Sequence, residues 1–237
     1  MYPRNKLLIF ALQVLCLGFL CACTYHGQIR RGIYQPTSSD NRLDASVLVV
    51  SDQDIPTQIT IAESETSSLY TFTLDVADGV AVAATDALST LITYADAGPH
   101  TLEHQYELVA HVKLNAQLTR TNCEMDDWEA QSVRVNGLCT QLSLTLHRAG
   151  STKPLGTFSA KRWGLFHKPG VPAAILWLNK HTFSLLSPVL VPGYTQLQGA
   201  ALRKQFEQQL KEVLQDIVQQ LQPQIVTWKK QGIPANK

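Results

Sequence analysis

"YELVAHVKLNAQLTRTNC", residues 106–123, alternates apolar and polar side chains over most of its length. Its apolar positions are Tyr106, Leu108, Ala110, Val112, Leu114, Ala116 and Leu118. Alternation with a period of two indicates a strand with one face on a core and the other mostly in water. We therefore expect a long antiparallel strand here, with the rest of the fold arranged around it.

Shorter stretches on both sides also read as strands. "CTQLSLTLHRAG" (139–150) and "TFSAKRWGLF" (157–166) follow, and with residues 106–123 they predict a three-stranded antiparallel meander. Upstream, "ASVLVVS" (45–51), "TQITIA" (57–62) and "LYTFTLD" (69–75) are further candidates. The sequence therefore predicts a sheet built mostly of antiparallel strands.

Two segments have helical periodicity. Apolar residues recur at steps of three and four in the first at Val76, Val80, Ala83, Ala84, Ala87, Leu88, Leu91 and Ile92. In the second they recur at Leu202, Phe206, Leu210, Val213, Leu214, Ile217, Val218 and Leu221. Pro223 is expected to kink or end the second helix. The fold class is thus α+β, with both amphipathic helices packed on one face of the sheet.

The N-terminus resembles a bacterial lipoprotein signal. Arg4 and Lys6 precede an apolar run over residues 7–22, and Leu20-Cys21-Ala22 comes just before Cys23, as in a lipobox. The resemblance implies that Cys23 is acylated and anchors the chain to lipid. With Thr24 in the next position, the resemblance further implies the outer membrane, on its periplasmic face. An ordinary cleaved signal peptide and a retained transmembrane anchor are the alternatives.

These features divide the chain into four parts. Residues 1–22 are the expected signal peptide, and 23–44 are polar and read as a flexible tether. Residues 45–222 form the expected α+β domain, with an apolar, proline-rich insert at 170–193, and 223–237 form a tail.

After removal of the signal and acylation of Cys23, two cysteines remain. Cys123 and Cys139 form an even pair in a compartment that permits disulfides. A bridge across this loop would contribute about 3 kcal/mol in the chain-entropy model. We expect a structural disulfide.

The sequence has no specific catalytic signature. It lacks a P-loop, a Gly-x-Ser-x-Gly elbow and a His-Glu-x-x-His motif, so we assign no catalytic residue and no cofactor. The net charge of +1 gives no basic field for nucleic acid. His100, His104 and His111 could be imagined as metal ligands, but they are interpreted as surface or strand histidines. The acidic residues at 124–129 lack the spacing of a Ca²⁺ loop and are interpreted as a solvated loop. No metal site is therefore assigned.

The insert at 170–193 is the segment with a candidate binding role. Exposed together, its large side chains would form an apolar patch that docks a partner or dips into the membrane. These side chains are Ile175, Leu176, Trp177, Phe183, Leu185 and Leu186. Alternatively, the segment covers one end of the sheet as core.

With its lipobox, early strand, Ala-rich helix, hairpin and terminal amphipathic helix, the chain loosely resembles small periplasmic or outer-membrane lipoproteins of the YajG type. The resemblance implies a non-catalytic outer-membrane lipoprotein that gives a periplasmic binding surface to an envelope assembly, transport or secretion complex. Its partners would be membrane lipid and envelope proteins. A carrier for a lipid or glycan ligand is the alternative, favoured by a deep apolar cavity. A hydrolase would need a nucleophile and a base close together in space.

Overall fold

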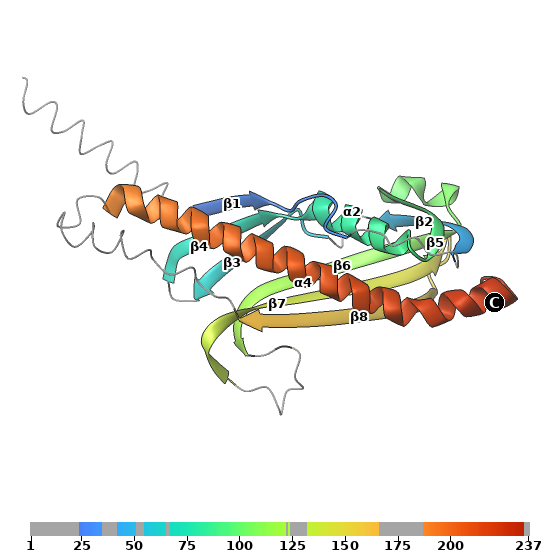
Figure 1. Ribbon diagram of the computed structural model, residues 1–237. Coiled ribbons are helices and arrows are strands. Elements are labelled where there is room, and N and C mark those ends of the chain that lie inside the picture. The colour runs from blue at the N-terminus through green and yellow to red at the C-terminus, as the bar shows by residue number, and fades with distance from the viewer. Residues whose placement is uncertain are drawn as a thin grey trace, which may run out of the picture.

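The computed structural model has an α+β fold, which confirms the class predicted from the sequence (Figure 1). The residues it describes are 24–34, 42–50, 55–64, 67–121, 123, 132–165 and 187–234. Within them the elements are β1 (Thr24–Gln28), β2 (Leu43–Val50), β3 (Gln58–Ser64), β4 (Ser67–Asp75), α2 (Ala77–Leu88), β5 (Ile92–Gly98), the 3-10 helix η1 (His100–Gln105), β6 (Leu108–Thr121), β7 (Ser132–Arg148), β8 (Pro154–Leu165) and α4 (Ser187–Gln231).

The larger sheet has the strand order β5-β2-β6-β7-β8. Its second half is the predicted meander, because β7 pairs antiparallel with both β6 and β8. Its first half is parallel, because β2 pairs in parallel with both β5 and β6. The sheet is therefore mixed, with the long strand β6 between the two halves.

A smaller sheet has the order β1-β4-β3, with β1 parallel and β3 antiparallel to β4. Here the structure differs from the flexible tether expected at 23–44, because Thr24–Gln28 form β1. Tyr25, Ile29 and Tyr34 are buried. These apolar side chains, spaced through a polar segment, attach it to the body of the domain.

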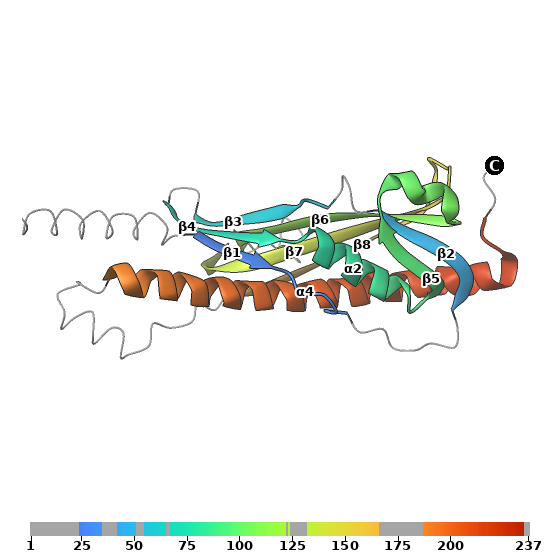
Figure 2. The same ribbon diagram turned by 90° about the horizontal axis from the view of Figure 1, so that it is seen from above.

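Both helices lie on the same face of the sheets, as predicted. Figure 2 shows α4 along this face, with α2 beside it. One core joins the buried faces of both helices to the even-numbered residues of β6, β7 and β8, such as Leu108, Val112 and Leu144. Four alanines of α2 face this core, and their small size lets the helix lie close to the sheet; they are Ala81, Ala83, Ala84 and Ala87.

The first helix is shorter than its periodicity suggests. It ends at Leu88, and the Thr90 hydroxyl donates a hydrogen bond to the Ala87 backbone oxygen over 2.7 Å. Ile92 then begins β5, a strand that was not predicted from the sequence. Leu91 and Ile92 are buried as expected, but Leu91 lies in the turn after α2 and Ile92 in β5.

The second helix is longer than predicted, because Pro223 lies inside α4 and does not end it. A proline within a helix costs about 3 kcal/mol. Beyond it, Ile225 and Trp228 continue the buried stripe, with only 1% and 6% of their surface exposed. Burying two such side chains contributes about 1.5–3 kcal/mol each, enough to offset the proline.

Glutamines of α4 cover the edge of the larger sheet. Gln205 Nε2 donates to the Gly164 backbone oxygen at 2.9 Å, and Gln220 Nε2 donates to that of Ser159 at 3.1 Å. Both acceptors lie on the edge strand β8. Because an uncovered edge is a template for association with other chains, these side chains have a structural role.

Candidate functional site

The end of the domain next to Cys23 is built by β1. Cys23 lies outside the described residues, but β1 begins at Thr24, the following residue. In β1, Thr24 pairs with Thr71 and Tyr25 with Phe72 of β4. Any group attached to Cys23 is therefore one residue away from the folded body.

Two glycines bring the N-terminal segment close to the helices. A Cβ atom placed on Gly199 of α4 would lie 2.0 Å from the Tyr25 ring, and one on Gly79 of α2 would lie 2.6 Å from Ile29. Real Cβ contacts are not that short, so both positions need glycine. The Arg30 backbone N–H also donates to Glu207 Oε1 of α4 over 3.1 Å. Residues 25–30 therefore run in the same direction as α4.

The predicted disulfide is confirmed: Cys123 and Cys139 are bonded. Cys139 is buried in β7, where it pairs with Gln117 of β6 and Trp163 of β8. The bond therefore ties the chain after β6 to the centre of the meander.

The predicted contact residues Ile175, Leu176, Trp177, Phe183, Leu185 and Leu186 lie outside the described residues. The acidic residues at 124–129 do so as well. The end of the insert, residues 187–193, belongs to the first turns of α4.

None of the helices in the described ranges combines the length and apolar composition that a membrane crossing requires.

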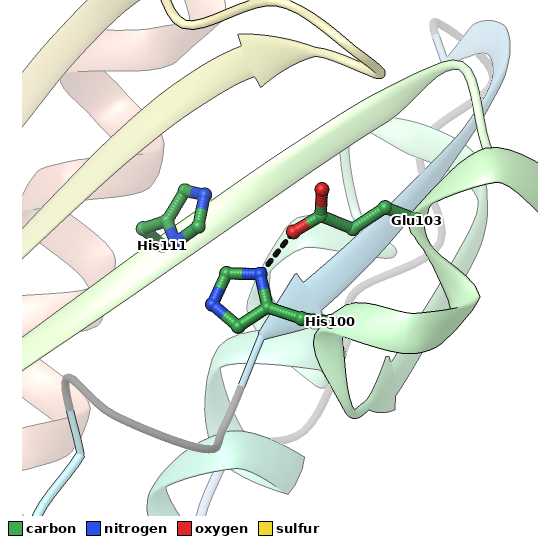
Figure 3. Close-up of side chains that lie close together, drawn as sticks. All are labelled: His100, Glu103 and His111. Carbon is green, nitrogen blue, oxygen red and sulfur yellow. Dashed lines mark hydrogen bonds and ion pairs between the residues drawn. The ribbon is translucent and has the colours of Figure 1, made fainter.

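A cluster of metal-ligating side chains forms where η1 lies over the larger sheet (Figure 3). His100 and Glu103 come from η1 and His111 from β6, and one ligand atom from each lies within 4.8 Å of the other two. His100 Nδ1 is paired with Glu103 Oε1. The side chains of His100 and Glu103 are 38% and 29% exposed, so the cluster is open to solvent. The exposed His104 is not part of it.

His147 of β7 extends this cluster. Its ring centroid lies 5.1 Å from that of His111, with the two rings nearly perpendicular, and the His100 and His111 centroids are 5.0 Å apart. His147 Nδ1 is buried and has no hydrogen-bond partner among the described residues. Three histidines and one carboxylate therefore gather on three elements.

The topology explains why the sequence did not predict this cluster. Three residues make one turn of a 3-10 helix, so His100 and Glu103 share a face. His111 is opposite Thr145 and His147 is opposite Val109, which makes the two histidines diagonal neighbours on the sheet face away from α4. The sequence did contain one signal for part of the cluster. His111 and His147 both occupy odd-numbered positions, which place them on the sheet face opposite the core leucines.

The interface between helices and sheet is filled with core side chains. Leu142, Leu146, Phe206 and Leu210 have no accessible surface, so no water-sized void touches them. A polar groove of about 850 Å³ lies outside this core along β8 and α4. Its lining residues include Gln141, Ser159, Lys161, Arg162, Asp216 and Gln220. This groove suits a polar ligand better than a lipid chain.

Comparison with known proteins gives no match to a family model and none to a curated protein. Among solved structures, the chain is similar to protein XCC0632 from Xanthomonas campestris, described as DUF330, with 10% identity over 85% of this chain and 98% of the other (TM-score 0.45). It is also similar to a neuraminyllactose-binding hemagglutinin homolog from Helicobacter pylori, with 10% identity over 76% and 98% (TM-score 0.34). At these values the similarities carry no argument about function.

Proposed function

We propose that this chain is a non-catalytic lipoprotein of the bacterial outer membrane, anchored through acylated Cys23. Its periplasmic domain would give a binding surface to an envelope assembly, transport or secretion complex. The observation that carries the proposal is the start of β1 at Thr24, directly after the proposed lipid attachment site. With no spacer between them, the lipid would fix one end of the domain at the bilayer.

The direction of α4 supports a domain that extends away from this anchor. Tyr25 lies against Gly199, and α4 continues for 32 residues to Gln231. At 1.5 Å per residue this distance is about 48 Å. The opposite end of the domain would therefore be far enough from the bilayer to meet partners in the periplasm.

The Cys123–Cys139 disulfide supports a location outside the reducing cytosol, because such bonds persist in oxidising compartments such as the periplasm. The proposal that the protein is not an enzyme rests on the sequence, which lacks a P-loop, a Gly-x-Ser-x-Gly elbow and a His-Glu-x-x-His motif.

The anchor can be tested with two neighbouring cysteines. We expect wild-type protein from a Gram-negative host to fractionate with the outer membrane and to carry an N-terminal acylated Cys23 by mass spectrometry. The Cys23→Ser variant should lose both properties, whereas Cys21→Ser should keep them. A Cys23→Ser variant that retains the acyl mass, or wild-type protein with an unmodified Cys23 thiol, would overturn the proposal.

The insert is the proposed contact surface. Since α4 begins at Ser187, twelve residues before Gly199, the helix reaches about 18 Å beyond the Tyr25 contact, towards the anchored end. The segment at 170–186 leads directly into this end of α4. We therefore propose that Trp177 and Phe183 contact the bilayer or a partner close to it.

A Trp177→Ser, Phe183→Ser variant tests this surface. If the residues form a docking surface, the variant should keep the wild-type Tm but lose partners that crosslink to the wild-type protein in intact envelopes. A lowered Tm with unchanged crosslinks would instead assign the insert to the core.

A glycan carrier is the second candidate, because the groove along β8 and α4 is lined by amide, hydroxyl and charged side chains. Binding of soluble peptidoglycan fragments, measured by calorimetry with wild-type protein and Lys161→Ala, tests it. Equal heats for both proteins, or no heat for either, would exclude this groove as a glycan site.

A further inference from the structure

We propose that His100, Glu103 and His111 bind a divalent transition-metal ion of the Zn²⁺ class, with His147 as the fourth ligand. This proposal is independent of the lipid anchor. It rests on ligand atoms of His100, Glu103 and His111 that lie within 4.8 Å of one another, and on the ring of His147 next to that of His111.

The donor types select this class of metal. Imidazole nitrogens suit Zn²⁺, Cu²⁺ and Ni²⁺, whereas Ca²⁺ and Mg²⁺ prefer oxygen ligands. Three histidines and one carboxylate complete a four-coordinate shell, the usual number for structural zinc. The site is therefore expected to reject Ca²⁺.

The distances require a small closure. Two ligands on tetrahedral zinc lie about 3.4 Å apart, since each is about 2.1 Å from the metal. The ligand atoms of His100, Glu103 and His111 all lie within 4.8 Å of one another, so no pair of them is more than about 1.4 Å too far apart. Side-chain rotation on η1 can supply this change, because His100 and Glu103 are partly exposed. The strands β6 and β7 would hold the other two ligands in place.

His147 gives an independent argument. A buried polar atom without a hydrogen-bond partner is destabilising, and an ion is one common explanation for such an atom. His147 Nδ1 is such an atom, and its ring lies against that of His111. A metal bound beside His111 would satisfy it.

The site lies far from the N-terminal end of the domain. His147 follows Leu146, which pairs with Gly156 of β8, and Gln224 of α4 lies next to Gly156. Gln224 is 25 residues beyond Gly199, a distance of about 37 Å along the helix. Bound metal would join η1 to the sheet at this distal end and stabilise the folded state.

The test is calorimetric titration of the full-length protein, produced without a histidine tag and treated with chelator, with Zn²⁺ and separately with Ca²⁺. We expect one Zn²⁺ per chain, no heat from Ca²⁺, and a higher Tm with Zn²⁺. His100→Ala and His111→Ala should weaken Zn²⁺ binding by more than the roughly 10–100-fold typical of lost outer-shell contacts. His104→Ala is the matched control on the same short helix and should bind as the wild type does.

The His111→Ala variant could fail to fold, because His111 lies on a central strand. His100 lies on η1 and is partly exposed, so His100→Ala should fold and still tests the site. Circular dichroism establishes that each variant is folded. Absence of Zn²⁺ binding in the wild type, equal binding by His100→Ala, or an equal loss in His104→Ala would each overturn the proposal.

Discussion

The Tyr25 ring of β1 lies directly against the backbone of Gly199 in α4. A Cβ atom on Gly199 would fall 2.0 Å from Cγ of this ring, and Tyr25 is only 5% exposed. The absence of one side chain therefore allows the N-terminal strand to dock on the C-terminal helix.

This contact predicts that Gly199→Ala destabilises the protein. Alanine is favoured over glycine in a helix by about 1 kcal/mol, but overpacking a core contact costs about 1–3 kcal/mol. We expect a net loss of unfolding free energy in urea denaturation. The control is Ala200→Gly at the neighbouring exposed position, which should lose about 1 kcal/mol through propensity alone.

A second variant identifies the cause. In a Tyr25→Ala background the clash is absent, so Gly199→Ala should become neutral or stabilising. An equal loss in both backgrounds would show that Tyr25 is not the reason for the glycine.

The elements that could be predicted from sequence are those whose signal lies within one segment. The alternation in β6 and the stripe from Leu202 to Leu221 give the correct element and the correct buried face. The order of strands in the sheet and the parallel pairing of β2 were not accessible in this way, because they depend on which distant segments meet.

The features that were not predicted from the sequence share one physical origin. β1 is short and mostly polar, and it is a strand because β4 and Gly199 provide a place for it. α4 continues past Pro223 because Ile225 and Trp228 are buried. His111 and His147 are 36 residues apart in the chain and become neighbours only through the β6–β7 register. Tertiary contacts decided each of these cases.

A buried hydrogen bond between β7 and α4 gives another prediction. The Thr140 hydroxyl donates to Gln209 Oε1 at 2.7 Å, and Gln209 Nε2 donates to the Leu138 backbone oxygen at 3.0 Å. Thr140→Val keeps the shape but leaves the amide oxygen of Gln209 without this donor. We expect a loss of about 1–3 kcal/mol of unfolding free energy.

Thr145→Val on the same strand is the control for this change. Thr145 lies on the opposite face, and its hydroxyl is 3.5 Å from that of Thr157 near solvent. Its replacement should alter stability by less than about 0.5 kcal/mol. Similar losses for the two variants would contradict a specific role for the buried pair.

The disulfide should contribute measurably to stability. Its cysteines are separated by 16 positions, for which the chain-entropy model gives about 3 kcal/mol. We expect the double variant Cys123→Ala, Cys139→Ala to unfold at a lower urea concentration. Reductant should shift the wild type towards this midpoint and leave the double variant unchanged. A wild type insensitive to complete reduction, as measured by free-thiol titration, would refute this estimate.

Asp86 predicts a stability effect that depends on pH. Burial raises the pKa of the Asp86 carboxyl above its usual value, so the folded state holds this proton more tightly than the unfolded chain. This contribution to stability is therefore fully present below the unfolded-state pKa and is lost as pH rises through the folded-state pKa. At pH 7 the carboxylate also lies in the last turn of α2, where the helix dipole disfavours negative charge.

Asp86→Asn removes this charge, and we expect it to raise the unfolding free energy at pH 7 by about 0.3–1 kcal/mol. The gain should disappear towards pH 3, where the wild-type carboxyl is protonated in both states. Asp78 provides the opposite control, because it lies in the first turn of the same helix and pairs with Arg31 at 3.7 Å. Asp78→Asn should therefore leave stability unchanged or lower it at pH 7. Thermal unfolding at both pH values distinguishes these outcomes, and a gain from Asp86→Asn that persists at pH 3 would rule out its charge as the cause.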